Sequence, residues 1–130
     1  MAYDAYLKLD GITGESNAAN HQGETEIYSF SFGIRQVGVS EPHGSVREAS
    51  FIKSLDSISA TLFQKCATGD HIATAVLSLD NTVGASSLPF ATYTMSDVMI
   101  VSVRPTGSTK GDKPLEEFTL NFTKLEWKRA

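Results

Sequence analysis

The sequence predicts a mainly β protein: a small antiparallel β-barrel or sandwich with one flanking α-helix at about residues 57–68. Two observations carry this prediction. Most of the chain alternates apolar and polar residues, as strands do when one face is buried. Residues 58–66 instead place apolar side chains at helical spacing. At 130 residues and 41% hydrophobic content, the chain is expected to form one domain over residues 1–130.

Alternation predicts strands at residues 3–9 and 24–33, joined by a polar loop. The second strand has two contrasting faces. One face carries the aromatic side chains of Tyr28, Phe30 and Phe32, and the other carries Ser29, Ser31 and Gly33. The aromatic face is interpreted as domain core or as a platform on which a ligand stacks. The small face is interpreted as a solvent-exposed surface or as the wall of a cavity or pore.

The predicted helix follows a strand at residues 47–55. Either Asp56 or Ser57 is expected to cap it, because a side-chain oxygen can accept an amide hydrogen of the first turn. Gly69 suits the left-handed residue just past a helix end. The apolar stripe of the helix consists of Ile58, Leu62, Phe63 and Cys66.

Four more strands are expected at residues 72–79, 88–94, 97–104 and 116–128. The strand at 97–104 is nearly continuous in apolar residues, so both of its faces are expected to be covered. In the last strand the apolar pattern changes face before Leu125 and Trp127. A bulge would explain the change, and so would a strand that serves the core first and a subunit contact afterwards.

Charge and composition exclude several classes of protein. The formal net charge is −4 and the pI is about 5.3, with scattered basic residues, which argues against a nucleic-acid-binding surface. No apolar run reaches the roughly 18–20 residues needed to cross a bilayer. The first residues lack the pattern of a signal peptide, so the expectation is synthesis in the cytosol and export, if any, without a cleavable signal. The single Cys66 excludes an internal disulfide framework.

No residue pattern predicts a catalytic, cofactor or metal site. The three histidines, His21, His43 and His71, form no HExxH motif. Cys66 lies on the apolar stripe, where cysteine behaves as a small hydrophobe. Neighbouring Glu116 and Glu117 point to opposite faces of a strand and are expected to be solvated edge charges.

Five segments, in order along the chain, carry a resemblance to a known family. They are Gly14-Glu15-Ser16 after the opening strand, Phe30-Ser31-Phe32-Gly33 where the family usually has W-S-W-G, Ser50-Phe51-Ile52-Lys53 with Asp56, the helix end followed by His71, and Phe118-Thr119-Leu120-Asn121-Phe122-Thr123-Lys124. On these segments the chain resembles the haemolysin-coregulated protein (Hcp) family, the tube protein of bacterial type VI secretion. The resemblance covers essentially the whole chain. Phe in place of Trp keeps the aromatic face, whereas Asp70 stands where the family usually has Lys.

The resemblance implies a structural protein and not an enzyme. Family members form hexameric rings that stack into a hollow tube, inside a contractile sheath and beneath a spike, and some hold small effector proteins in the lumen. The implied partners are further copies of the chain, the sheath, spike and baseplate proteins, and effectors. The implied location is the bacterial cytoplasm, followed by secretion. No cofactor, nucleic acid or membrane insertion is implied.

Within this framework the small-residue face becomes the candidate lumen surface: Ser29, Ser31 and Gly33. Residues 36–47 read as a long polar loop, a candidate for contact between rings or neighbouring subunits. Its candidate contact residues are Gln36, Val39, Glu41, Pro42, His43 and Arg47. Two alternatives stay open. One is a monomeric ligand-binding β-domain, for example for a carbohydrate, and the other is an enzyme that uses Cys66 or His71.

Overall fold

The computed structural model describes residues 3–36, 45–81, 88–109, 111 and 113–129. The elements of this described part follow one another in the order β1 (Tyr3–Leu9), β2 (Thr25–Ile27), β3 (Ser29–Gln36), β4 (Ser45–Ser54), α1 (Ser59–Thr68), β5 (His71–Asn81), β6 (Leu88–Thr106), β7 (Leu115–Asn121) and β8 (Lys124–Arg129). The mainly β class with one helix is therefore confirmed. Within the described ranges, no helix is long and apolar enough to cross a membrane.

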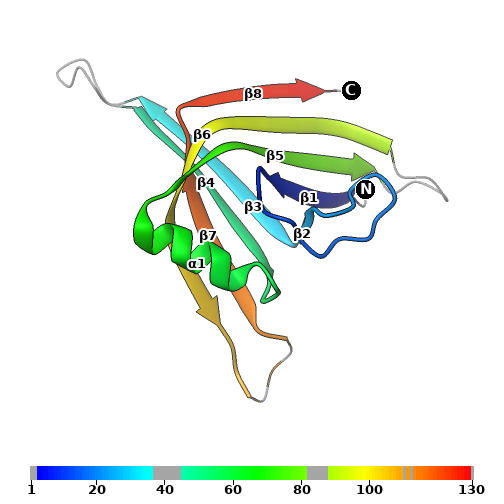
Figure 1. Cartoon of the computed structure of the whole chain (residues 1–130). Coiled ribbons are helices and arrows are strands. Elements are labelled where there is room, and N and C mark those ends of the chain that lie inside the picture. Colours follow the sequence, from blue (N-terminus) through cyan, green and yellow to red (C-terminus); the bar gives the residue numbers. More distant parts are fainter. Residues whose placement is uncertain (1–2, 37–44, 82–87, 110, 112, 130) are drawn as a thin grey trace.

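The strands form one antiparallel sheet in the order β2-β1-β5-β6-β7-β4-β3, with β8 added beside β6 (Figure 1). Only Tyr28 separates β2 from β3, so the two ends of this strand order adjoin in the chain. The backbone N–H of Tyr28 donates to the carbonyl oxygen of Ile52 at 2.8 Å, which holds this junction against β4. The sheet thus curls into the barrel-like arrangement that the sequence predicts.

β6 is a single strand where the sequence predicts two. Its first half pairs with β5 and β8, and its second half pairs with β7. Asp97, between the two predicted strands, has a positive φ of 52°, a conformation that Asp adopts more readily than most residues. The expectation that both faces of residues 97–104 are covered is wrong in part, because Val101 is 39% exposed.

The predicted strands 24–33 and 116–128 are each divided in two. The break at Phe122 and Thr123 separates β7 from β8. β7 pairs with residues 99–106 of β6 and β8 pairs with residues 91–96, so both halves run along the same strand on either side of this break. The apolar side chains on the two sides of the break differ in burial: Phe122 is buried in the core, whereas Trp127 of β8 is 61% exposed.

The helix begins at Ser59, two residues later than predicted, with Ile58 at the N-cap and no capping bond from a side chain. The Asp56 carboxylate instead accepts a hydrogen bond from the Ile58 amide at 3.1 Å. Gly69 ends the helix as predicted, with a φ of 73° and a bond from its N–H to the Lys65 carbonyl. Phe63 does not belong to the buried stripe, because it is 57% exposed.

The core lies between the two halves of the curled sheet. Phe51 of β4 and Phe118 of β7 stack in it at 5.3 Å between ring centroids. Phe30 and Phe32 pack partly buried against this core, as the core interpretation of the aromatic face requires. Tyr28 departs from that interpretation, since it is 54% exposed.

Candidate functional site

The candidate lumen residues lie together on the outer face of β3. Ser29, Ser31 and Gly33 are all exposed, while Phe32 on the opposite face stacks on Tyr93 of β6 at 4.6 Å between centroids. β3 pairs only with β4 in the described part of the chain, so it forms an edge of the sheet. The result is an exposed strip of small, uncharged side chains backed by packed aromatic rings.

The predicted contact loop is shorter than expected at both ends. Gln36 is the last residue of β3 and pairs with Ser45, and Arg47 lies in β4 opposite Ile34. The Arg47 guanidinium donates to the Thr123 carbonyl oxygen at 2.6 Å. These two residues therefore belong to strands and not to a loop. The other four candidates, Val39, Glu41, Pro42 and His43, lie outside the described residues.

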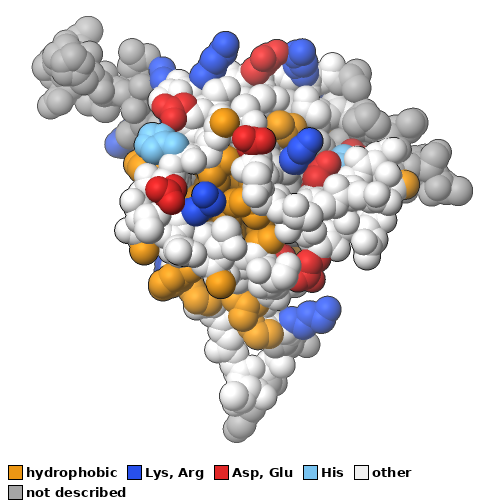
Figure 2. All heavy atoms as spheres, in the orientation of Figure 1, with side chains coloured by type: hydrophobic (Ala, Val, Ile, Leu, Met, Phe, Trp, Pro, Cys, Tyr) orange, Lys and Arg blue, Asp and Glu red, His pale blue; other side chains and the backbone are white. Residues whose placement is uncertain are grey.

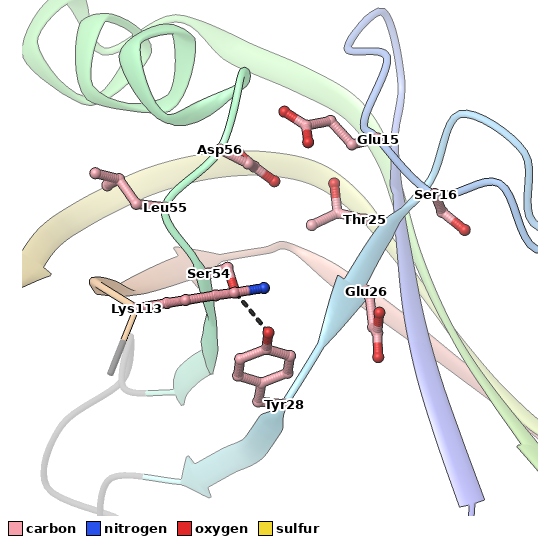
Figure 3. Close-up of a pocket in the computed structure, with 9 residues that line it drawn as sticks. All are labelled: Glu15, Ser16, Thr25, Glu26, Tyr28, Ser54, Leu55, Asp56 and Lys113. Atoms are coloured by element: carbon pink, nitrogen blue, oxygen red, sulfur yellow. Dashed lines mark hydrogen bonds between the residues drawn. The ribbon is translucent and has the colours of Figure 1, made fainter. Parts of the chain in front are cut away.

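A polar cavity of about 450 Å³ opens beside the junction of β2 and β3 (Figure 3). Three carboxylates from separate elements border it, those of Glu15, Glu26 and Asp56, together with the Lys113 side chain. Glu15 accepts a hydrogen bond from the backbone N–H of Ser57 at 2.6 Å. That bond, with one to the Ser57 side chain, lowers the pKa of Glu15 below 4.5. The cavity wall is therefore predominantly negative.

The remaining lining of this cavity is mixed. It consists of Ser16, Thr25, Tyr28, Ser54 and Leu55. The hydroxyl groups of Tyr28 and Ser54 share a hydrogen bond of 2.5 Å, drawn in Figure 3. This bond links the exposed Tyr28 side chain of one wall of the cavity to Ser54 at the end of β4.

Beside this cavity lies a buried charge cluster that sequence reasoning missed. Lys53 is fully buried, with its Nζ 2.8 Å from Asp56 Oδ1 and 2.7 Å from Glu116 Oε1. Glu116 was expected at a solvated edge, and that expectation is wrong, since it is 1% exposed. Glu117 meets the expectation only in part: its side chain is 44% exposed beside the exposed Arg104, but β7 lies between β6 and β4 and is not an edge strand. In the sequence, the only indication of this buried charge cluster was a lysine in an otherwise alternating strand.

Among the described residues, Cys66 and His71 have different surroundings. Cys66 is partly buried and packs against the core. His71 is exposed and its Nδ1 lies 2.7 Å from Asp97 Oδ1. Among the residues that the structure describes, no group of three or more His, Cys, Asp or Glu side chains could hold a metal ion.

Large apolar side chains remain on the surface. Figure 2 shows apolar atoms gathered on the lower half of one face, in the region where Figure 1 shows α1. Phe63 of α1 and Leu55, just before it, are 57% and 45% exposed. Trp127 of β8 is 61% exposed and stacks on Tyr93 at 5.6 Å. Large exposed apolar groups that gather on one face are typical of protein–protein contacts.

Comparison with known proteins gives a consistent result. The family model described as type VI secretion system effector, Hcp, matches residues 6–128. Protein hcp1 of Pseudomonas aeruginosa is 29% identical over 133 residues, which cover 97% of this chain and 82% of that protein.

Solved structures agree with these sequence matches. The crystal structure of Hcp1 from Salmonella typhimurium superposes with a TM-score of 0.87 at 34% identity, covering 100% of this chain and 87% of that chain. A type VI secretion system effector from Yersinia pestis gives a TM-score of 0.81 at 29% identity, covering 98% of this chain and 88% of that chain. The fold also recurs in the sheath-tube complex of an extracellular contractile injection system, with a TM-score of 0.63 at 15% identity. The match covers 100% of this chain and 91% of that chain.

Proposed function

The chain belongs to the Hcp family of type VI secretion tube proteins, and we propose that it assembles into hexameric rings that stack into a hollow, expelled tube. The observation that carries the proposal is the family match over residues 6–128, on a fold shared along the whole chain. The role is structural. The proposed location is the bacterial cytoplasm before firing and the outside of the cell afterwards.

The proposed ring contacts use the edges of the sheet and the surface around α1. β3 and β8 each pair with one strand only in the described part of the protein. An exposed strand edge is an aggregation hazard, and a neighbouring subunit would cover it. A head-to-tail contact between two different surfaces closes into a ring if its rotation closes. Phe63 and Leu55 supply apolar area beside such a contact.

The proposed lumen surface is the outer face of β3. Short uncharged side chains at Ser29, Ser31 and Gly33 leave space at the ring centre and offer hydroxyl groups to a bound protein. The proposed further partners are the sheath, spike and baseplate proteins, and small effectors held in this lumen. For the segment at residues 37–44, the proposal is a stacking contact. Deleting residues 39–44 should then spare the fold but weaken stacking or secretion.

The first test is the solution mass of the purified protein, measured by light scattering after size separation. A mass of six chains is expected. A monomer at micromolar concentration would contradict self-assembly and favour the ligand-binding alternative. That alternative has limited support, because Phe30 and Phe32 pack against the core and only Tyr28 of the three rings is exposed.

A further inference from the structure

His21 lies at the meeting point of three parts of the molecule, although the sequence around it predicts a simple loop. It is only 8% exposed. Its Nε2 lies 2.6 Å from Oδ2 of Asp80 in β5, and its Nδ1 lies 2.9 Å from Oε1 of Glu24. Its ring stacks on Tyr6 of β1, with 4.3 Å between centroids and 11° between planes. The imidazole is thus held on both nitrogens and on one face.

This geometry selects the protonated form of His21. An imidazolium donates from both nitrogens, whereas a neutral imidazole has a single N–H and can donate to only one carboxylate. Burial by itself lowers the pKa of His21, but the hydrogen bonds to Asp80 and Glu24 and the charges of both outweigh it. The net effect is a pKa raised above 6.5.

The other titratable groups that act on His21 and on the Tyr6 ring beside it are carboxylates. Tyr6 has a pKa raised above 10.0, first by burial and then by the nearby carboxylates of Asp4, Glu26, Asp80 and Glu24. Tyr6 therefore stays uncharged where His21 titrates. Loss of the imidazolium charge would remove a positive charge 2.6 Å from Asp80, which is completely buried, and would therefore weaken the contact between His21 and β5.

His21 fastens the connection between β1 and β2. Within this connection the N–H of Gly14 donates to the Gly23 carbonyl at 2.6 Å, and the N–H of Ser16 donates to the Glu24 carbonyl at 2.9 Å. Glu15 lies between these two residues, and its carboxylate accepts a hydrogen bond from the Ser57 amide, just before α1. Glu15 and Ser16 also form part of the wall of the cavity in Figure 3. The connection therefore joins the end of β5 to the start of the helix.

We propose that protonated His21 is a pH-sensitive clasp that holds residues 11–24 against β5, and that its deprotonation loosens this segment and the cavity wall that it carries. The raised pKa of His21 gives the direction of the pH dependence. The stabilisation is fully present below about pH 6.5, the unfolded value, and is lost as the pH rises through the folded pKa.

The test uses the whole protein and does not depend on its assembly. Hydrogen–deuterium exchange is measured at about pH 5.5 and about pH 9, on either side of the titration of His21, and corrected for intrinsic exchange. Peptides from residues 11–24 should lose protection severalfold at the higher pH relative to peptides from β7. Exchange at the His21 ring carbon should report a pKa above 6.5. Equal protection of the segment at both pH values would overturn the proposal.

The matched variants are His21→Gln and His71→Gln. His21→Gln should show low protection of residues 11–24 at both pH values, while His71→Gln, at an exposed pair, should behave as the wild type. A pH dependence that persists in His21→Gln would overturn the proposal. If His21→Gln does not fold, Glu24→Gln serves instead. It removes one of the two carboxylates that contact His21, so the loss of protection of residues 11–24 should shift to lower pH. An unchanged midpoint of this loss would contradict the proposal.

Discussion

Lys53 and Glu116 lie directly opposite each other on β4 and β7 and form a buried ion pair, with 2.7 Å between Nζ and Oε1. The same ammonium group contacts Asp56, which in turn binds the Ile58 amide ahead of α1. Lys53 also donates to the Ser59 hydroxyl at 3.2 Å. One buried cation therefore joins two strands to the entry of the helix.

Replacing Lys53 by Met should cost about 3–5 kcal/mol of unfolding free energy, because it leaves Glu116 buried without a partner. The double variant Lys53→Met with Glu116→Leu should recover much of this loss, since the fully buried carboxylate is gone and the remaining one, Asp56, is partly exposed and still accepts the Ile58 amide. Urea unfolding at one fixed protein concentration measures the unfolding free energy of the single and the double variant. As a control, Arg104→Ala removes an exposed pair with a 3.9 Å separation and should cost less than about 1 kcal/mol. An equal cost for Lys53→Met and the control would refute the structural role of the cluster.

Gly14→Ala should destabilise the connection between β1 and β2. A Cβ atom there would lie 2.5 Å from the Glu24 carbonyl oxygen and still closer to the Thr25 hydroxyl. We expect a loss of about 1–3 kcal/mol, typical of overpacking. Gly33→Ala is the control, because its Cβ would meet nothing nearer than 4.0 Å. Thermal unfolding compares the two variants, and a melting temperature for Gly14→Ala at or above that of Gly33→Ala would contradict the prediction.

Phe63→Ser should reduce the solution mass without unfolding the subunit. The side chain is 57% exposed, so its loss removes little from the core but much from a subunit contact near α1. Light scattering gives the mass, and far-ultraviolet circular dichroism checks the fold. The neighbouring exposed residue supplies the control variant Gln64→Ser, which should assemble normally. Normal assembly of Phe63→Ser would exclude this surface from the ring contact.

Ser31→Cys should place a label at the centre of the ring. In a Cys66→Ala background the new thiol is the single cysteine, and Ser31 is exposed on β3. Electron microscopy of rings labelled with maleimide gold should show density in the lumen. Thr109→Cys, in the exposed connection before β7, serves as the comparison and should place density elsewhere. Gold at the outer rim for Ser31→Cys would disprove the lumen assignment.

The local patterns predict much of this fold correctly. Alternation over residues 3–9 matches β1, and Gly69 ends α1 in the left-handed conformation. Both succeed because they depend on short-range physics: the two-residue period of a strand and the steric freedom of glycine. The exposed strip on β3 follows from the same period.

The sequence by itself thus determined the β class, the single helix and which residues of a strand share a face. Only the tertiary structure decided that β6 continues through Asp97, that the predicted last strand breaks at Phe122 and Thr123 while both halves pair with β6, and that Phe63 lies at the surface. It also decided the burial of Lys53, Glu116, His21 and Asp80. A buried charge needs a partner, and here Glu116 meets Lys53 and Asp80 meets His21 from distant parts of the chain. Such pairing depends on three-dimensional contacts, which no local pattern contains.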